Sequence, residues 1–148
     1  MQMWVDADAC PSEIKELLYR AAMRRKIKVT LVANQQMRTP KSEYVDSIIV
    51  PAGMNVADRR IAALIEPGDL VVTSDIPLAA EVIEKGAYVI TSRGERYTRN
   101  NIGQRLNMRD FMETMRSSMA IGGGPPALGS RDKQAFANAL DTYLAKYA

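Results

Sequence analysis

The stretch VDADACPSE (residues 5–13) decides how the rest of this sequence is interpreted. It places two aspartates, Asp6 and Asp8, directly after a short apolar segment. Pro11 follows them, and proline favours the first turn of a helix. One aspartate in this place would be explained by helix capping. Two aspartates, beside the positive N-terminal end of a helix, indicate a second role besides capping.

The length and composition indicate one globular domain. The chain has 148 residues, of which 47% are hydrophobic, so residues 1–148 are predicted to form a single domain with a sizeable core. The first ten residues lack the basic start and apolar centre of a signal peptide. No apolar run approaches the roughly 18 residues of a membrane span. We therefore expect a cytoplasmic protein with no membrane association.

The scarcity of two residue types restricts the chemistry. The chain has one cysteine, Cys10, and no histidine. This composition excludes an intrachain disulfide, a multi-cysteine zinc site and every catalytic arrangement that needs imidazole. Cys10 is a poor candidate for a nucleophile because no histidine is present to activate it. Acid–base or metal chemistry must therefore rest on carboxylates.

Short apolar runs alternate with helical patterns along the chain. The predicted strands are residues 3–5, 29–33, 47–50, 70–73 and 88–91, and the predicted helices between them are residues 11–25, 55–65 and 76–85. Residues 92–101 and 121–130 are predicted as a polar loop and a flexible connection, and a last helix begins after Ser130. This order predicts an α/β fold with a mostly parallel central sheet of about five strands and helices on both faces.

Several acids follow strands of this sheet. Ligands of parallel sheets bind beyond the carboxyl ends of the strands. Asp6 and Asp8 follow the first strand, and Ser74 and Asp75 follow the fourth. These side chains converge if the two strands are neighbours. Asp58, in the first turn of the second helix, is expected to reach the same edge. Carboxylates without histidine are the ligands that Mg²⁺ and Mn²⁺ prefer, and these ions promote phosphoryl chemistry.

Positive charge is concentrated in one segment. Residues 93–116 hold six arginines and three acids, a surplus of three that equals the net charge of +3. The arginines are Arg93, Arg96, Arg99, Arg105, Arg109 and Arg116. A solvated helix face explains such a run, and so does a phosphate-binding surface, because the planar guanidinium suits phosphate oxygens.

Several motifs carry a resemblance to a known family. VDADACP, NVADRRI (residues 55–61), PGDLVVTSDIPLAAEVIEKGA (residues 67–87) and RGERY (residues 93–97) resemble the bacterial YaiI/YqxD family of uncharacterised proteins over nearly the whole chain. That family is regarded as related to the PIN-like nucleases, which implies a single PIN-like domain. TSDIPLA (residues 73–79) is similar to the PIN pattern of Thr, any residue, Asp, then Leu-Ala.

The resemblance implies roles for individual acids. Asp6 matches the acid after the first PIN strand, and Asp75 matches the acid after the fourth. Asp8 and Asp58 are their companions. PIN nucleases commonly carry a further acid just after the position of Asp75, where this chain has Ile76-Pro77.

The residues and the resemblance together predict a metal-dependent nuclease or phosphodiesterase that acts on RNA, with DNA as the less favoured substrate. Asp6, Asp8, Asp58 and Asp75 are the predicted catalytic residues, and the first two with Asp75 are the predicted ligands of Mg²⁺ or Mn²⁺. The expected partner is single-stranded RNA. The predicted substrate-binding residues are Asn34, Ser74, Arg93, Arg96 and Arg99.

Two alternatives remain open on the sequence. One is a non-catalytic RNA-binding or interaction module that keeps the PIN-like fold. The other is a phosphatase of the haloacid dehalogenase type, because DAD after a first strand resembles the nucleophile and acid pair of that class. Asp69 and Asp75 would be its later acids, but Asp69 precedes the fourth strand and is expected at the opposite edge of the sheet, as a turn residue.

Overall fold

The computed structural model describes residues 1–53, 55–108 and 128–147. In this part of the chain one sheet has the strand order β3-β2-β1-β4-β5-β6. The first five strands are parallel, and β6 is antiparallel to β5. The strands are β1 Met3–Asp6, β2 Val29–Ala33, β3 Val45–Ile49, β4 Leu70–Val72, β5 Tyr88–Ile90 and β6 Arg96–Tyr97. The predicted α/β fold with a mostly parallel sheet is confirmed.

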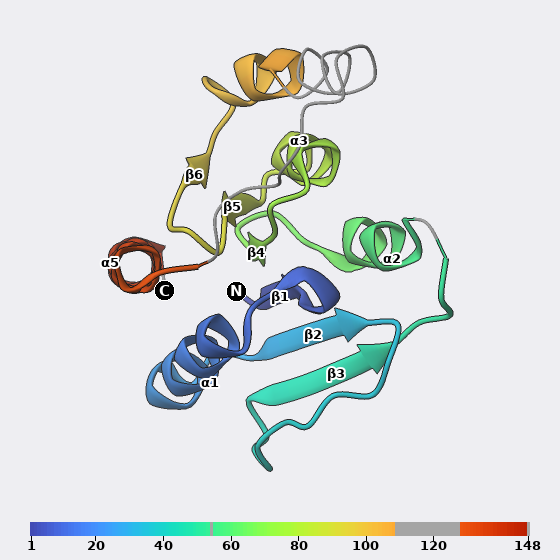
Figure 1. Cartoon of the computed structure of the whole chain (residues 1–148), viewed down its shortest axis with the longest axis vertical. Coiled ribbons are helices and arrows are strands. Elements are labelled where there is room, and N and C mark those ends of the chain that lie inside the picture. Colours follow the sequence, from blue (N-terminus) through green and yellow to red (C-terminus); the bar gives the residue numbers. More distant parts are fainter. Residues whose placement is uncertain (54, 109–127, 148) are drawn as a thin grey trace.

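Helices cover both faces of this sheet, as predicted. They are α1 Ser12–Arg25, α2 Val56–Leu64, α3 Ile76–Glu84 and α5 Ser130–Tyr147, with a short 3₁₀ helix, η1 Ala7–Ala9, after β1. Residues 102–108 are also helical. In Figure 1, α1 and α5 lie on one side of the sheet and α2 and α3 on the other.

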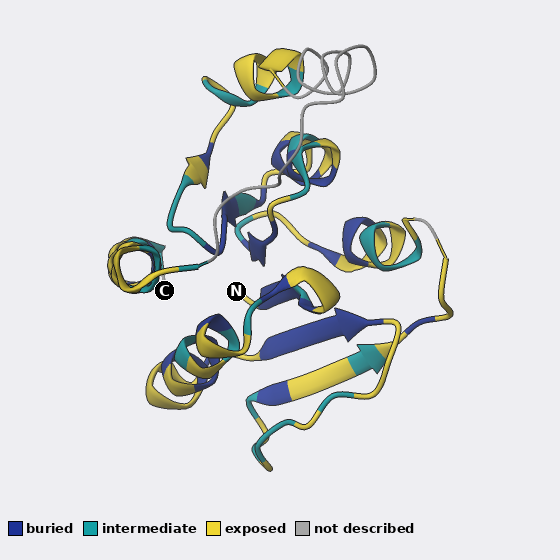
Figure 2. Cartoon of the chain, in the orientation of Figure 1, coloured by how far each residue is buried: buried dark blue, intermediate teal, exposed yellow. Residues whose placement is uncertain are grey.

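Alternate strand residues supply two cores. Met3 and Val5 of β1 belong to the core under α1 and α5, whereas Trp4 belongs to the core under α2 and α3. The central strands β1, β2 and β4 are therefore almost entirely buried, and the middle of the edge strand β3 is exposed (Figure 2). Burial on both faces explains why the central strands are continuous apolar runs.

Helix α5 is held by specific contacts besides apolar packing. Phe136 and Leu144 are fully buried, and the hydroxyl of Tyr143 donates a hydrogen bond to the carbonyl of Gly68 at 2.8 Å. Gly94, in the turn between β5 and β6, has a φ of +84°. A Cβ atom at this position would lie 2.5 Å from the backbone carbon of Ala135, so only glycine allows this turn to pack on α5.

Two local predictions differ from the structure. The segment predicted as a polar loop contains β6, because the Thr91 hydroxyl accepts the amide of Glu95 at 3.1 Å and the chain turns back at Gly94. A strand of two residues carries no periodicity that a sequence pattern reveals. Asn55 occupies the N-cap position of α2 as predicted, but its φ is +62° and its side chain makes no capping hydrogen bond. Most of the predicted connection at residues 121–130 lies outside the described residues.

Candidate carboxylate site

The sheet topology brings the predicted acids to one edge. Strands β1 and β4 are hydrogen-bonded neighbours, with Val5 opposite Val72. The chain leaves β1 towards β2 on one side and returns later to β4 on the other, so the two strands form the topological switch point where parallel sheets bind ligands. Asp6 ends β1, and Thr73 directly follows β4 beside it.

A hydrogen-bonded chain links the ends of these two strands. The backbone amide of Asp75 donates to the Thr73 hydroxyl at 3.0 Å. That hydroxyl donates to Oδ2 of Asp6 at 3.2 Å. Thr73 is only 3% exposed, so its hydroxyl has a fixed place between the two acids. The prediction assigned no role to Thr73, although the residue is part of the quoted Thr-x-Asp pattern.

Asp75 is also the N-cap of α3. Its Oδ1 accepts the backbone amide of Leu78 at 2.9 Å, and Pro77 lies in the first turn of this helix. Asp6 behaves differently, because it precedes η1 without making a side-chain capping bond. Helix capping therefore explains the carboxyl of Asp75 but not that of Asp6.

Asp58 joins the same cluster from the first turn of α2. Its carboxyl lines the same cleft as that of Asp75 and interacts with it electrostatically. Burial raises the pKa of Asp58 from its ordinary value of 3.8 to about 6, and the charges of Asp75 and Asp6 act in the same direction. Burial also raises the pKa of Asp6, against the lowering effect of the Thr73 hydrogen bond. Three acids from separate segments thus interact strongly.

Asp8 lies at the rim of this cluster. It is exposed in η1, and its Oδ2 accepts the backbone amide of Asn34 at 2.8 Å. Its charge contributes to the raised pKa of Asp6. Asn34 thus contacts the site through its main chain, at the end of β2. Ser74 is exposed between Thr73 and Asp75.

A cleft of about 350 Å³ opens beside Asp58 and Asp75, between α2 and α3. Two of its lining residues, Arg59 and Glu81, were not predicted. The charge of Glu81 adds to the raised pKa of Asp58. The spacing of Pro77 and Glu81 at i and i+4 would place both on one face of the predicted helix, which is the signal that could have found Glu81. The cleft is lined by Asn55, Asp58, Arg59, Asp75, Pro77, Leu78 and Glu81.

The predicted substrate-binding arginines lie apart from the carboxylates. Arg93 forms an ion pair with Asp132 of α5 at 2.7 Å. Arg99 donates to the carbonyl of Ile83, near the C-terminal end of α3, at 3.4 Å. This is the end of α3 opposite to its N-cap Asp75. Arg105 pairs with Glu95, and the predicted residues Arg109 and Arg116 lie outside the described residues.

The comparisons with known proteins agree with the motifs. The model of a family described as the uncharacterised YaiI/YqxD family matches residues 4–146. The chain belongs to the YaiI/YqxD family. A UPF0178 protein of Alkalilimnicola ehrlichii is 60% identical to it over 97% of both chains. One from Thioalkalivibrio sulfidiphilus is 58% identical over 99% of both chains. No solved structure matches the chain.

Two further residues of this YaiI/YqxD protein bear on alternative chemistry. Burial raises the pKa of the Cys10 thiol to about 12, which opposes a thiolate nucleophile. Asp69 is 5% exposed at the opposite edge of the sheet, where it accepts the indole N–H of Trp4 at 3.1 Å and the amides of Gln2 and Glu66. It is a buried turn residue, so the phosphatase alternative loses one of its two later acids.

The donor chemistry of the cluster suits a hard divalent cation, because it consists of carboxylate oxygens. Within residues 1–53, 55–108 and 128–147, however, no three Cys, Asp or Glu side chains are arranged to hold a metal ion as they stand. The charges of Asp75 and Asp6 add to the rise in the Asp58 pKa, so these carboxylates repel one another as they stand. A bound cation would offset this repulsion.

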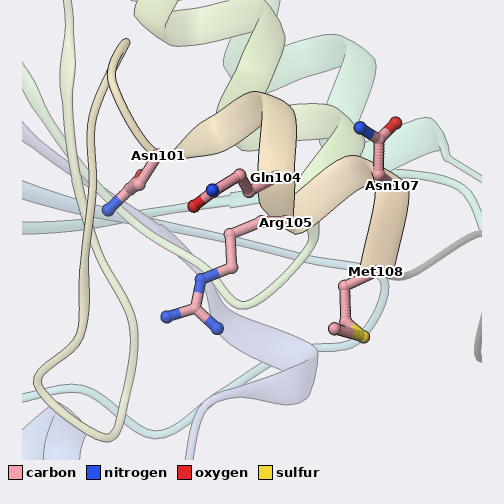
Figure 3. A pocket seen from close by; sticks show the side chains of 5 residues that line it. All are labelled: Asn101, Gln104, Arg105, Asn107 and Met108. Atoms are coloured by element: carbon pink, nitrogen blue, oxygen red, sulfur yellow. The ribbon is translucent and has the colours of Figure 1, made fainter.

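A larger hollow lies elsewhere in the described part of the chain. It measures about 740 Å³ and is lined by Asn101, Gln104, Arg105, Asn107 and Met108, along the helical residues 102–108 (Figure 3). None of these residues is acidic.

None of the helices in the described part of the chain is both long and apolar enough to span a membrane.

Proposed function

We propose that this protein is a metal-dependent nuclease or phosphodiesterase that acts on single-stranded RNA. The observation that carries the proposal is the convergence of Asp6, Asp58 and Asp75 from three separate segments at the switch point of the sheet. Such crowding destabilises the protein in the absence of a cation, because buried carboxylates repel one another. Function is the usual reason for an arrangement of this kind.

In this proposal Asp6 and Asp75 would hold Mg²⁺ or Mn²⁺, with Asp8 at the rim and Asp58 beside them. The bound ion would supply electrostatic stabilisation of the charge that develops on a phosphodiester. Other side chains of the protein would position these ligands. Thr73 fixes the orientation of Asp6 and of the Asp75 backbone through its two hydrogen bonds.

Two residues of the cleft have chemistry that suits a phosphodiester. Arg59 offers its guanidinium to phosphate oxygens beside the carboxylates, which would otherwise repel the substrate. Asp58, with a pKa of about 6, can hold or accept a proton near neutral pH, as a general acid or base requires.

The experiment compares the wild type with Asp75→Asn on single-stranded RNA in Mn²⁺. Asparagine keeps the capping oxygen and removes the charge, so the variant is expected to fold and to lose cleavage. Asp141→Asn is the matched control, because Asp141 is an exposed acid of α5 that pairs only with Arg24 in the described part of the chain. The three proteins are purified in parallel.

Two results would contradict the proposal. One is equal cleavage by the wild type and Asp75→Asn, and the other is cleavage that persists in excess EDTA. Binding of RNA without turnover in any divalent metal would instead favour the non-catalytic binding module.

A further inference from the structure

A second hollow, of about 510 Å³, lies at the other end of the sheet. It is bounded by the C-terminal end of α3, by β6 and the residues after it, and by the last turn of α5. Tyr88 places it at the amino edge, because the backbone amide of Tyr88 bonds to the carbonyl of Asp69 before β4. The lining residues are Ile83, Gly86, Ala87, Tyr88, Arg96, Tyr97, Thr98, Arg99, Asn100 and Tyr147.

The charge of this hollow is positive. Among the described residues that line it, Arg96 and Arg99 are basic and none is acidic. Arg96 is exposed and forms no ion pair with another described residue. Arg99 pairs with Glu84 at 3.9 Å, and both side chains are mostly exposed. An exposed pair at this distance leaves most of the guanidinium charge available to a ligand.

Helix capping does not account for these arginines. The last carbonyls of α3 are already satisfied by the main chain, because the amide of Gly86 bonds to Ile83 and that of Ala87 bonds to Val82, both at 3.0 Å. Gly86 allows this arrangement through its φ of +91°. The hydrogen bond from Arg99 to the Ile83 carbonyl, at 3.4 Å, is therefore not required to satisfy the C-terminal carbonyls of α3.

Hydroxyl groups face the same positive charges. Tyr88 and Tyr147 stack with their ring centres 4.4 Å apart, and both line the hollow. The neighbouring Lys146 lowers the pKa of Tyr147, and the charge of Arg96 acts in the same direction. Electropositive surroundings of this kind favour an anion, and Thr98 and Asn100 add polar side chains to the rim.

We propose that this hollow binds a phosphate group, carried either by a nucleotide or by a single-stranded nucleic acid. Two guanidinium groups match phosphate oxygens by charge and by planar geometry. The length of the strands separates the hollow from the carboxylates by about 10–15 Å. The proposal therefore stands whether or not the carboxylate cleft cleaves RNA.

The test measures binding in excess EDTA, so that no metal contributes. The probes are 5′-AMP, adenosine as its phosphate-free counterpart, and a fluorescent single-stranded DNA of ten nucleotides. The variant Arg96→Gln/Arg99→Gln is expected to weaken binding of the phosphate-bearing probes by about tenfold or more, since hydrogen bonds from two charged groups are lost. Arg20→Gln/Arg25→Gln removes the same charge from exposed positions of α1 and is expected to change binding much less.

The pattern across the probes identifies the source of the phosphate. Binding of 5′-AMP without adenosine binding indicates a nucleotide site, and binding of the oligonucleotide alone indicates a strand site. The proposal is overturned if the wild type binds neither phosphate-bearing probe, or if the two double variants weaken binding equally.

Discussion

The carboxyl of Asp58, on α2, lines the same cleft as the carboxyl of Asp75, the N-cap of α3, and the charge of Asp75 adds to the rise in the Asp58 pKa. Burial of Asp58, together with this repulsion, raises its pKa to about 6. The folded protein thus keeps the Asp58 proton to a higher pH than an ordinary surface acid does and releases most of it by neutral pH.

The first prediction concerns stability against pH. The folded protein holds the Asp58 proton up to a pKa of about 6, whereas the unfolded chain loses it near 3.8. The free energy of unfolding is therefore expected to fall as pH rises from about 4 to about 6. Because Asp58 is partly exposed, solvent screening limits this loss to about 1 kcal/mol. Thermal melting in EDTA across this range measures it.

Asp58→Asn is the informative variant for this prediction. It removes the titrating group, so its melting temperature should depend less on pH than that of the wild type. Asp141→Asn should keep the wild-type dependence. Identical slopes for the wild type and Asp58→Asn would contradict a raised pKa of Asp58 in the folded protein.

The second prediction separates a metal site from a structural acid. Mn²⁺ at a hundredfold excess over its Kd should stabilise the wild type by about 2.7 kcal/mol, which raises the melting temperature by about 5 °C or more. Asp6→Asn should gain much less, because one ligand charge is lost. In EDTA the same variant should melt at an equal or higher temperature, since repulsion with Asp75 is relieved. Lower melting in EDTA with an unchanged response to Mn²⁺ would make Asp6 a structural residue.

The third prediction concerns the buried hydroxyl between β1 and β4. Thr73→Val keeps the shape and removes the bonds to Asp6 and to the Asp75 amide. The loss should destabilise the protein by about 1–3 kcal/mol, because buried polar groups lose their partner. Thr73→Ser keeps the hydroxyl and should retain most of the stability and the Mn²⁺ response. Equal melting of the valine and serine variants would contradict this role.

Much of this site could be predicted from the sequence because it depends on topology. Asp6 and Asp75 follow apolar strands, and the carboxyl ends of parallel strands share one edge, so their convergence required only that β1 and β4 be neighbours. The family resemblance is likewise confirmed over residues 4–146.

Other features depended on contacts that no local pattern encodes. Arg99 looked like a companion of the carboxylates, but the antiparallel turn at Gly94 carries it to the opposite edge of the sheet. Asp69 looked like an ordinary turn residue, and its burial against Trp4 is visible only in the fold. Glu81 and Arg59 enter the cleft because α2 and α3 pack together on one face.

The fourth prediction tests the packing of the β5–β6 turn on α5. Gly94→Ala introduces a methyl group 2.5 Å from the backbone of Ala135, at a φ that disfavours alanine. It should destabilise the protein by at least about 2 kcal/mol through strain and displacement of α5. Gly103→Ala is the control, since nothing lies within 4 Å of its Cβ position. Comparable stability of the two variants in a denaturant titration would contradict the observed packing.

The place of α5 in the chain has a consequence for biosynthesis. All strands of the sheet precede residue 98, whereas the helix that covers half of one face begins at Ser130. The ribosome adds about 5–20 residues per second. The strands are therefore synthesised a few seconds before α5, the helix that later covers them. During that interval the apolar strand side chains that share a core with Phe136 and Leu144 lack this helix. Transiently exposed apolar surface of this kind favours aggregation, so a chain stalled before Ser130 is expected to aggregate more readily than the full chain.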